Sequence, residues 1–161
     1  MLFSFIGSSS SFHTKDNTLY NSSLYLPLGK SKSITFTVQA NCNAHIGFIC
    51  NTCNEFYEIV IGGWSNTRSV IKRRPLGIFI NDEANATSTP WILHGNEYRS
   101  FWAEVFNGLV RFGKGQIIGQ NIVLKWQDHS PKIPNSIGFM TGFGSSGDWH
   151  IQDLGLYVQK F

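Results

Sequence analysis

The sequence predicts an all-β fold, an antiparallel β-sandwich of about ten short strands with little helix. Apolar and polar residues alternate with period two from Ser33 to Ala40, which is typical of a half-buried strand. Further β-like segments follow at intervals of about 8–12 residues, and no window of about 11 residues keeps a helical apolar stripe. Two packed sheets are the expected way to bury the apolar faces of such strands, and a barrel is the second choice.

The individual strands are predicted from alternation, from dense apolar runs and from the turn residues between them. Ala44–Cys50 and Phe56–Ile61 are dense apolar runs separated by turn-forming residues, so we interpret them as central strands. Asn107–Gly108 supplies the two positive φ angles of a type I′ turn, so the segments on either side should pair as a hairpin. The other predicted strands are Arg68–Arg74, Gly77–Ile80, Tyr98–Val105, Leu109–Gly113, Asn121–Asp128, Ile137–Thr141 and Trp149–Tyr157.

Length and composition indicate one folded unit. The chain has 161 residues, of which 42% are hydrophobic and 14% aromatic, enough for one core and too short for two domains. Residues 7–18 are Ser-rich and lack periodicity, so we expect an N-terminal arm over 1–18 and a single domain over 19–161. The net charge of +3 gives no basic footprint, and we expect no nucleic-acid partner.

Targeting signals are weak. The apolar run at residues 2–6 is shorter than a secretory signal, and no stretch approaches the ~20 apolar residues that cross a bilayer, so we expect no membrane insertion. Asn21 and Asn85 begin N-glycosylation patterns. These patterns favour an extracellular protein, although no signal peptide is present in this chain.

Three cysteines, Cys42, Cys50 and Cys53, cannot all pair within one chain. With His45 they offer four zinc ligands, but His45 and Cys50 have opposite parity on one predicted strand, which argues against a shared metal ion. A vicinal or intermolecular disulfide and free thiols in a hairpin are the alternatives. In an extracellular protein the odd cysteine is a candidate for a disulfide-linked dimer.

Residues 142–147 spell G-x-G-x-x-G, the pattern of dinucleotide and adenosyl-cofactor sites. That motif must open a helix within a βαβ unit, whereas here a predicted strand follows it. We therefore interpret the segment as a loop whose glycines allow positive φ angles.

Catalytic patterns are scarce, and we expect no enzyme activity. The sequence contains no G-x-S-x-G nucleophile elbow. Glu58 and Glu104 interrupt predicted strands, and an outward-facing position is the simplest interpretation of each. If Glu58 points inward instead, it needs a cation, and Arg73 or Arg74 is the natural partner across the turn at 62–67.

Four tryptophans with polar neighbours lie at or near the ends of predicted strands: Trp64, Trp91, Trp126 and Trp149. An indole face beside carboxylates, amides and a guanidinium is suited to sugar recognition, and the alternative is that these rings fill the core. The oxygen-bearing residues Asn81, Asp82, Glu83 and Asn85 could hold calcium, although an ordinary polar loop is the simpler interpretation. We expect no other cofactor.

Several blocks of the sequence share one pattern: Tyr57–Trp64, Asn66, Ser69–Arg74, Phe101–Trp102, Trp126-x-Asp128 and Ile137–Gly144, with Trp149. The pattern resembles the farnesoic acid O-methyltransferase domain family over about residues 34–157. Despite that name, the chain lacks the alternating β and α segments and the glycine-rich loop into a helix that an S-adenosylmethionine enzyme needs.

The resemblance implies a small β-rich module, found singly or in larger extracellular and invertebrate proteins, some of them sugar-binding lectins. The residues that match the family pattern are Glu58, Gly63, Trp64, Asn66, Arg73, Trp126, Asp128 and Trp149. The three cysteines are not part of that pattern.

These observations predict a non-enzymatic, lectin-like module that binds a carbohydrate or glycoconjugate. The predicted stacking platform is Trp64, Trp126 or Trp149, and the predicted hydroxyl partners are Asn66, Arg73, Asp128 and Asp148. Because single sugar contacts are weak, we expect multivalency through a homo-oligomer, which could be disulfide-linked. The alternatives are an S-adenosylmethionine-dependent O-methyltransferase acting on a small terpenoid acid, and a protein-binding adhesion module.

Overall fold

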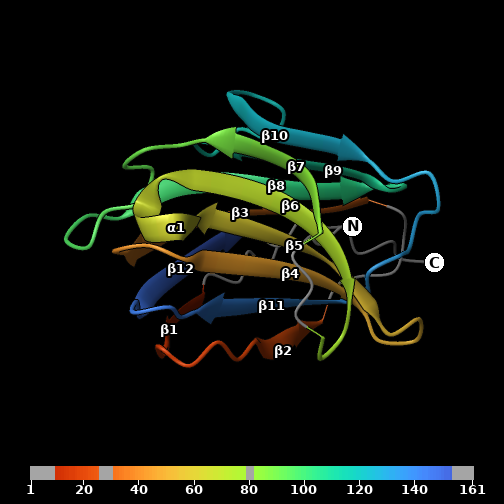
Figure 1. Ribbon diagram of the computed structural model, residues 1–161, viewed down its shortest axis with the longest axis horizontal. Helices are drawn as coiled ribbons and strands as arrows, with labels where there is room; N and C mark the ends of the chain where they lie inside the picture. Colours follow the sequence, from red (N-terminus) through yellow and green to blue (C-terminus); the bar gives the residue numbers. More distant parts are fainter. Residues whose placement is uncertain (1–9, 26–30, 79–81, 154–161) are drawn as a thin grey trace, which may run out of the picture.

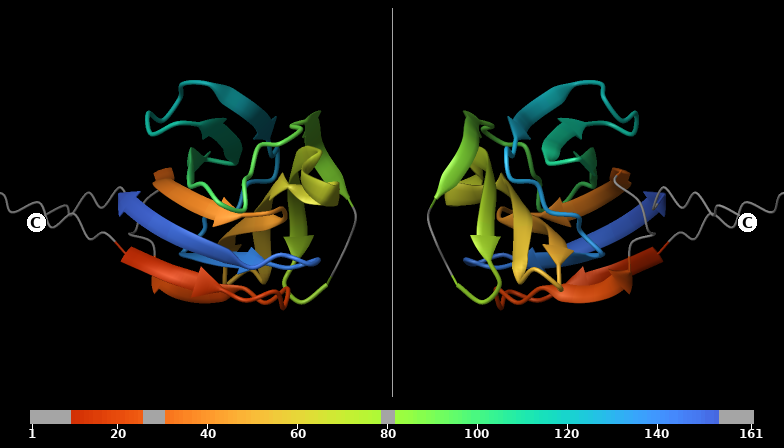
Figure 2. Two further views of the ribbon diagram at one scale, coloured as in Figure 1. Left: turned by 90° about the vertical axis from the view of Figure 1, so that its left-hand side faces the viewer. Right: turned by 90° about the vertical axis from the view of Figure 1, so that its right-hand side faces the viewer.

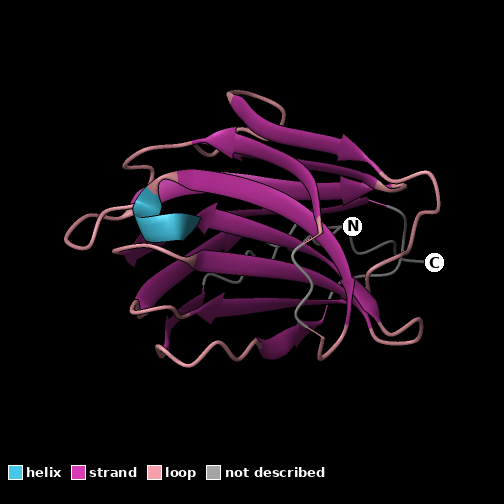
Figure 3. Cartoon of the chain, in the orientation of Figure 1, coloured by secondary structure: helices cyan, strands magenta, loops and turns pink. Residues whose placement is uncertain are grey.

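The computed structural model describes residues 10–25, 31–78 and 82–153 and shows two packed antiparallel sheets, which confirms the predicted β-sandwich (Figures 1 and 2). Sheet A contains, in order across the sheet, β1 (Ser10–Thr14), β12 (Gly147–Asp153), β3 (Ser31–Ala40), β8 (Arg99–Phe106), β9 (Leu109–Lys114) and β10 (Ile122–Gln127). Sheet B contains β2 (Asn21–Tyr25), β11 (Ser136–Thr141), β4 (Ala44–Cys50), β5 (Glu55–Gly62), β6 (Arg68–Pro75) and β7 (Glu83–Ser88). Sheet B lies in front of sheet A in Figure 1, and the short turn α1 (Gly63–Asn66) joins β5 to β6 (Figure 3).

The strands predicted from apolar runs and turn residues are present. The run Ala44–Cys50 is β4 at its predicted bounds, and every residue of that strand is buried. Asn107 and Gly108 have φ angles of 45° and 78°, and they join β8 and β9 into the predicted hairpin with Phe106 opposite Leu109. Turn chemistry and burial therefore locate the central strands.

The structure adds strands β1, β2 and β7 to the predicted set and alters the predicted strand at 77–80. Ser10–Thr14, part of the expected N-terminal arm, lies along the fold as edge strand β1 and pairs antiparallel with β12. The polar strands β2 and β7 were not predicted, because their sequences lack a clear apolar alternation. The predicted strand Gly77–Ile80 begins in a turn at Gly77, where φ is 76°, and its last two residues lie outside the described part, as does the end of the predicted strand at Tyr157.

The core lies between the sheets. Every second side chain of each strand points inward, and the inward side chains of the two sheets meet there. Ile34, Phe36 and Val38 of β3 point into it as the alternation predicts, each no more than 1% exposed. From sheet B, Tyr57 and Ile59 of β5 point into it from the opposite side. The two ends of the sandwich are left to the connecting loops, and α1 is one of them (Figure 1).

Candidate functional site

The turn α1 presents an exposed tryptophan on a left-handed backbone. The φ angles of Trp64, Ser65 and Asn66 are 49°, 59° and 62°, and the preceding Gly62 also has a left-handed φ of 58°. For non-glycine residues this conformation costs about 1–2 kcal/mol each. The indole of Trp64 is 42% exposed, so burial of the ring does not offset that cost.

Asn66 holds this turn in place. Its side-chain amide donates to the Leu93 carbonyl at 2.8 Å, and its side-chain oxygen accepts from the Leu93 N–H at 3.1 Å. The Trp91 N–H donates to the Asn66 carbonyl at 3.0 Å. Asn66 is 6% exposed, and both ends of its amide are used. The structure therefore places Asn66, a predicted hydroxyl partner, inside the turn, with both ends of its amide bonded to Leu93.

The polar surroundings of Trp64 come from the outer face of β6. The guanidinium carbon of Arg68 lies 4.6 Å from the centre of the indole, and Nζ of Lys72 lies 5.5 Å from it, both within cation–π range. Arg68 also donates to both carboxylate oxygens of Glu83, at 3.2 and 2.7 Å. The result is an apolar ring bordered by a guanidinium, an ammonium and a carboxylate.

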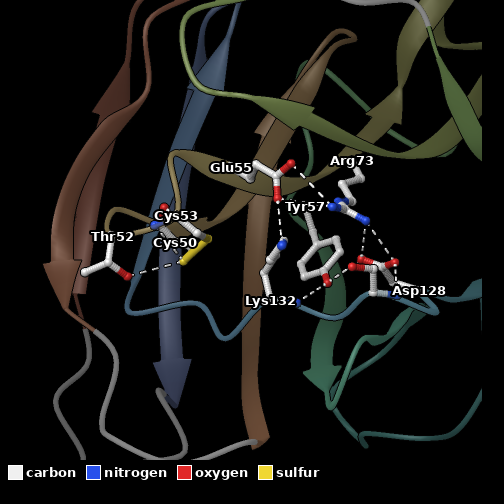
Figure 4. Close-up of polar contacts among 9 residues, drawn as sticks. Cys50, Thr52, Cys53, Glu55, Tyr57, Arg73, Asp128 and Lys132 are labelled. Atoms are coloured by element: carbon white, nitrogen blue, oxygen red, sulfur yellow. Dashed lines mark hydrogen bonds and ion pairs between the residues drawn. A yellow bond between two sulfur atoms is a disulfide. The ribbon is translucent and has the colours of Figure 1, made fainter.

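Arg73 and Asp128, predicted as hydroxyl partners, form an ion pair between the layers (Figure 4). Arg73 donates to the two carboxylate oxygens of Asp128 at 3.0 and 3.1 Å, and its other terminal nitrogen donates to Glu55. The Tyr57 hydroxyl donates to Asp128 at 2.8 Å and accepts from the Lys132 N–H at 2.9 Å. Burial, helped by the hydrogen bond to Asp128, raises the pKa of Tyr57 to about 12.

Asp128 lies at the centre of this network. Asp128 is 4% exposed, and it also accepts from the Ser130 N–H at 2.9 Å. Its contacts tie the connection between β10 and β11 to sheet B. Trp126 packs edge-on against Tyr57 with the ring centres 6.2 Å apart and is only partly exposed. Arg73 faces the core side of β6, opposite to Arg68, so the predicted partners of Trp64 do not gather around it.

Trp149 and Asp148 are neighbours in β12, so their side chains point to opposite faces of sheet A. Trp149 is 1% exposed, packs on Phe36 and Phe139, and donates from its indole N–H to Thr14 at 2.8 Å. The structure therefore places Trp149, a predicted stacking platform, in the core, where neighbouring aromatic rings cover it. Asp148 points to solvent and pairs with the exposed His13 at 2.8 Å.

A buried charge cluster on the outer face of sheet B was only partly predicted. Glu58 is 2% exposed and accepts from Arg74 at 2.7 Å, the pairing expected for a buried Glu58. It faces away from the core, but Tyr20 packs over it and donates to its carboxylate. Tyr20 can lie this close because Gly47 has no Cβ, which would stand 3.1 Å from its ring.

The charge on Glu58 is stabilised by its neighbours. Burial by itself would raise the pKa of the carboxyl. Interactions with His45, Arg74 and Tyr20 outweigh burial and lower this pKa from 4.5 to about 2. The carboxylate thus accepts hydrogen bonds from Tyr20 and Arg74. The signal that predicted an arginine partner was an acid flanked by apolar residues on a central strand.

Two of the three cysteines are paired, and the third is a free thiol. Cys50 and Cys53 form a disulfide across the β4–β5 hairpin, and Cys42 is a free thiol. Among the described residues, no three His, Cys, Asp or Glu side chains come together as a metal site. Of the proposed calcium ligands, Asn81 lies outside the described residues. In the same described part, no helix has the length and apolar character that a membrane span requires.

Solved structures of other proteins resemble this chain. Galectin-11 of sheep, solved as a complex with glycerol, is 8% identical, with a TM-score of 0.50 over 83% of this chain and 99% of the galectin chain. A prokaryotic β-1,3-1,4-glucanase (lichenase) from a mouse hindgut metagenome is 9% identical, with a TM-score of 0.46 over 90% and 99% of the two chains. At such identities the galectin shows a shared sandwich fold and nothing about activity.

A curated relative and a family model match this chain by sequence. A BTB/POZ domain-containing protein of Arabidopsis thaliana is 35% identical over 75 residues, which are 47% of this chain and 9% of the plant protein. The sequence model described as farnesoic acid O-methyl transferase matches residues 9–154, which include all twelve strands of the two sheets. The chain therefore belongs to the farnesoic acid O-methyltransferase family.

Proposed function

We propose that this chain is a non-enzymatic carbohydrate-binding module in which Trp64 is the stacking platform. The observation that carries the proposal is the exposed indole of Trp64 on a strained, left-handed turn. Residues held in unfavourable backbone conformations concentrate at ligand-binding sites, because the surrounding structure must maintain them for a purpose other than stability.

The chemistry around Trp64 supports a sugar as the ligand. An indole face offers an apolar surface to the C–H face of a sugar ring. The neighbouring Arg68 and Glu83 supply a donor fork and acceptor oxygens, the two kinds of group that hydroxyls need. Their mutual ion pair fixes both side chains beside the ring, so little conformational entropy would be lost on binding.

Two observations support a binding role over methyl transfer. The G-x-G-x-x-G segment is the connection between β11 and β12, and a strand follows it instead of a helix. The buried carboxylates Glu58 and Asp128 each accept hydrogen bonds from an arginine and a tyrosine. Buried carboxylates engaged in this way fit a structural role better than a catalytic one.

The test is calorimetry with a panel of monosaccharides, with and without calcium, preceded by a glycan array. We expect weak binding by the wild type and a loss of about three- to tenfold in affinity for Trp64→Ala. The matched control is Phe106→Ala, which removes an aromatic ring 50% exposed from the hairpin turn of sheet A. Equal affinities for wild type and Trp64→Ala would contradict the proposal, as would turnover of labelled S-adenosylmethionine.

A further inference from the structure

Trp91 is the most exposed large hydrophobic residue among the described part of the chain, with 79% of its surface accessible. Within the described residues its indole has no aromatic or cationic neighbour of the kind that Trp64 has in Arg68. A tryptophan so placed contributes little to the core, so its side chain needs another explanation.

The backbone at Trp91 is unusual for a bulky residue. Ile92 donates its N–H to the Thr89 carbonyl at 3.3 Å, closing a turn with Pro90 and Trp91 at its centre. Trp91 has a φ of 60°, as at the third position of a type II turn, where glycine or asparagine is the usual residue. A tryptophan is thus held in a place that local turn chemistry disfavours, as Trp64 is.

The same residue anchors both tryptophans. Trp91 donates its N–H to the carbonyl of Asn66, which lies two residues after Trp64, and the Asn66 amide clamps Leu93 two residues after Trp91. Chain geometry alone then keeps the Cα atoms of the two tryptophans within about 15 Å. Trp91 belongs to the loop between β7 and β8, and Figure 1 shows this green loop and α1 at the same end of the sandwich.

We infer that Trp91 is a second stacking platform, so that the ligand is an oligosaccharide chain that engages both indoles. This inference rests on the proposed function of Trp64. A single sugar ring presents its apolar face to one indole at a time, whereas two indoles fixed on one rigid anchor can stack on different units of the same chain. Binding at the second indole is then intramolecular and raises the affinity for longer chains.

The experiment uses calorimetry on the whole chain with cello-, manno- and galacto-oligosaccharides, each series running from monosaccharide to hexasaccharide. For the wild type we expect affinity to rise with chain length and then level off once both rings are engaged. Trp91→Asn should bind monosaccharides as the wild type does but lose the gain for longer chains, a difference of about three- to tenfold.

The variants separate this role from a structural one. Asparagine tolerates the left-handed backbone, so Trp91→Asn should have a Tm equal to or above that of the wild type. Trp91→Phe keeps an aromatic face and should retain part of the length dependence, and Phe106→Ala should match the wild type at every length.

Three results would overturn the inference. If Trp91→Asn follows the wild type at every chain length while Trp64→Ala is weaker, Trp91 is not a platform and the proposed function stands. If the wild type binds long chains no better than monosaccharides, the ligand is a single sugar. If no saccharide binds at all, the proposed function fails, and this inference fails with it.

Discussion

At the scale of single residues, burial and pairing decide which candidate side chains can bind a ligand. The sequence predicts Trp64, Trp126 or Trp149 as the platform, and the structure leaves the ring of Trp64 accessible. The sequence could not distinguish Trp64 from Trp149, because both are tryptophans beside polar residues near strand ends. The difference is one of position: Trp149 shares the core-facing parity of β12 and is covered from the opposite sheet.

Glu58 predicts how the stability of the chain changes at acid pH. Its pKa is about 2 in the folded chain, below the ordinary 4.5, so the unfolded chain binds more protons between these values. The stability that Glu58 contributes is therefore complete above pH 4.5 and is lost as pH falls towards 2, by about 3 kcal/mol in total. Urea unfolding followed from pH 7 to pH 2 measures this loss.

The matched variants for this prediction are Glu58→Gln and Glu97→Gln. The first leaves Arg74 without its carboxylate, and we expect the free energy of unfolding to fall by about 3 kcal/mol at pH 7. The free energy of unfolding of this variant should also depend less on pH between 4.5 and 2. The second alters an exposed pair with Arg99 and should change stability by less than about 1 kcal/mol. If the stability of Glu58→Gln depends on acid pH as that of the wild type does, the Glu58 carboxylate is not responsible for the loss of stability in acid.

At the scale of elements, the turns determine strand register and chain direction, which the strand sequences alone do not. Asn107–Gly108 was predicted as a type I′ turn, and it sets the register of β8 against β9. The sequence predicts a turn at 62–67, but not the left-handed conformation of α1 within it, since Gly63–Asn66 carry no strong turn motif apart from the glycine. Its conformation is selected from outside, by the bonds between Asn66 and Leu93.

The hairpin turn supplies an element-scale prediction. Gly108 has a φ of 78°, and a Cβ there would stand 2.6 Å from Cβ of Pro131 and 2.8 Å from the Asp128 carbonyl. Gly108→Ala should lower the free energy of unfolding by about 2 kcal/mol or more, through backbone strain and this clash. Gly115→Ala is the control, because φ is 88° there and the space is open. It should lose about 1 kcal/mol, and equal losses in thermal denaturation would refute the clash.

At the scale of the whole molecule, the remaining question is how several weak sites act together. The disulfide between Cys50 and Cys53 leaves Cys42 as the free thiol, so Cys42 is the residue that could link two copies. The sequence predicts multivalency through an oligomer, because a single shallow sugar contact gives little affinity.

We expect the purified chain to have a mass above that of one protomer in light scattering. If Cys42 provides the link, Cys42→Ser and added reductant should both convert a covalent dimer to monomer on a non-reducing gel. The paired variant Cys50→Ser with Cys53→Ser should leave such a dimer intact, because it removes only the internal bridge. A single-protomer mass at every concentration would contradict the expected oligomer.

The sequence by itself determined the fold class and most of the strands, since alternation, apolar runs and the Asn107–Gly108 turn are local signals that the side chains carry with them. It also indicated that a buried Glu58 would need an arginine, because an isolated charge cannot be buried at low energy. Only the tertiary structure decided that β1 completes sheet A, that Asn66 is an anchor, and that Trp64 and Trp91 are exposed at one end of the sandwich. These outcomes depend on contacts between segments distant in the chain, and the free energy of such contacts overrides local preference, even to the point of holding two tryptophans in left-handed turns.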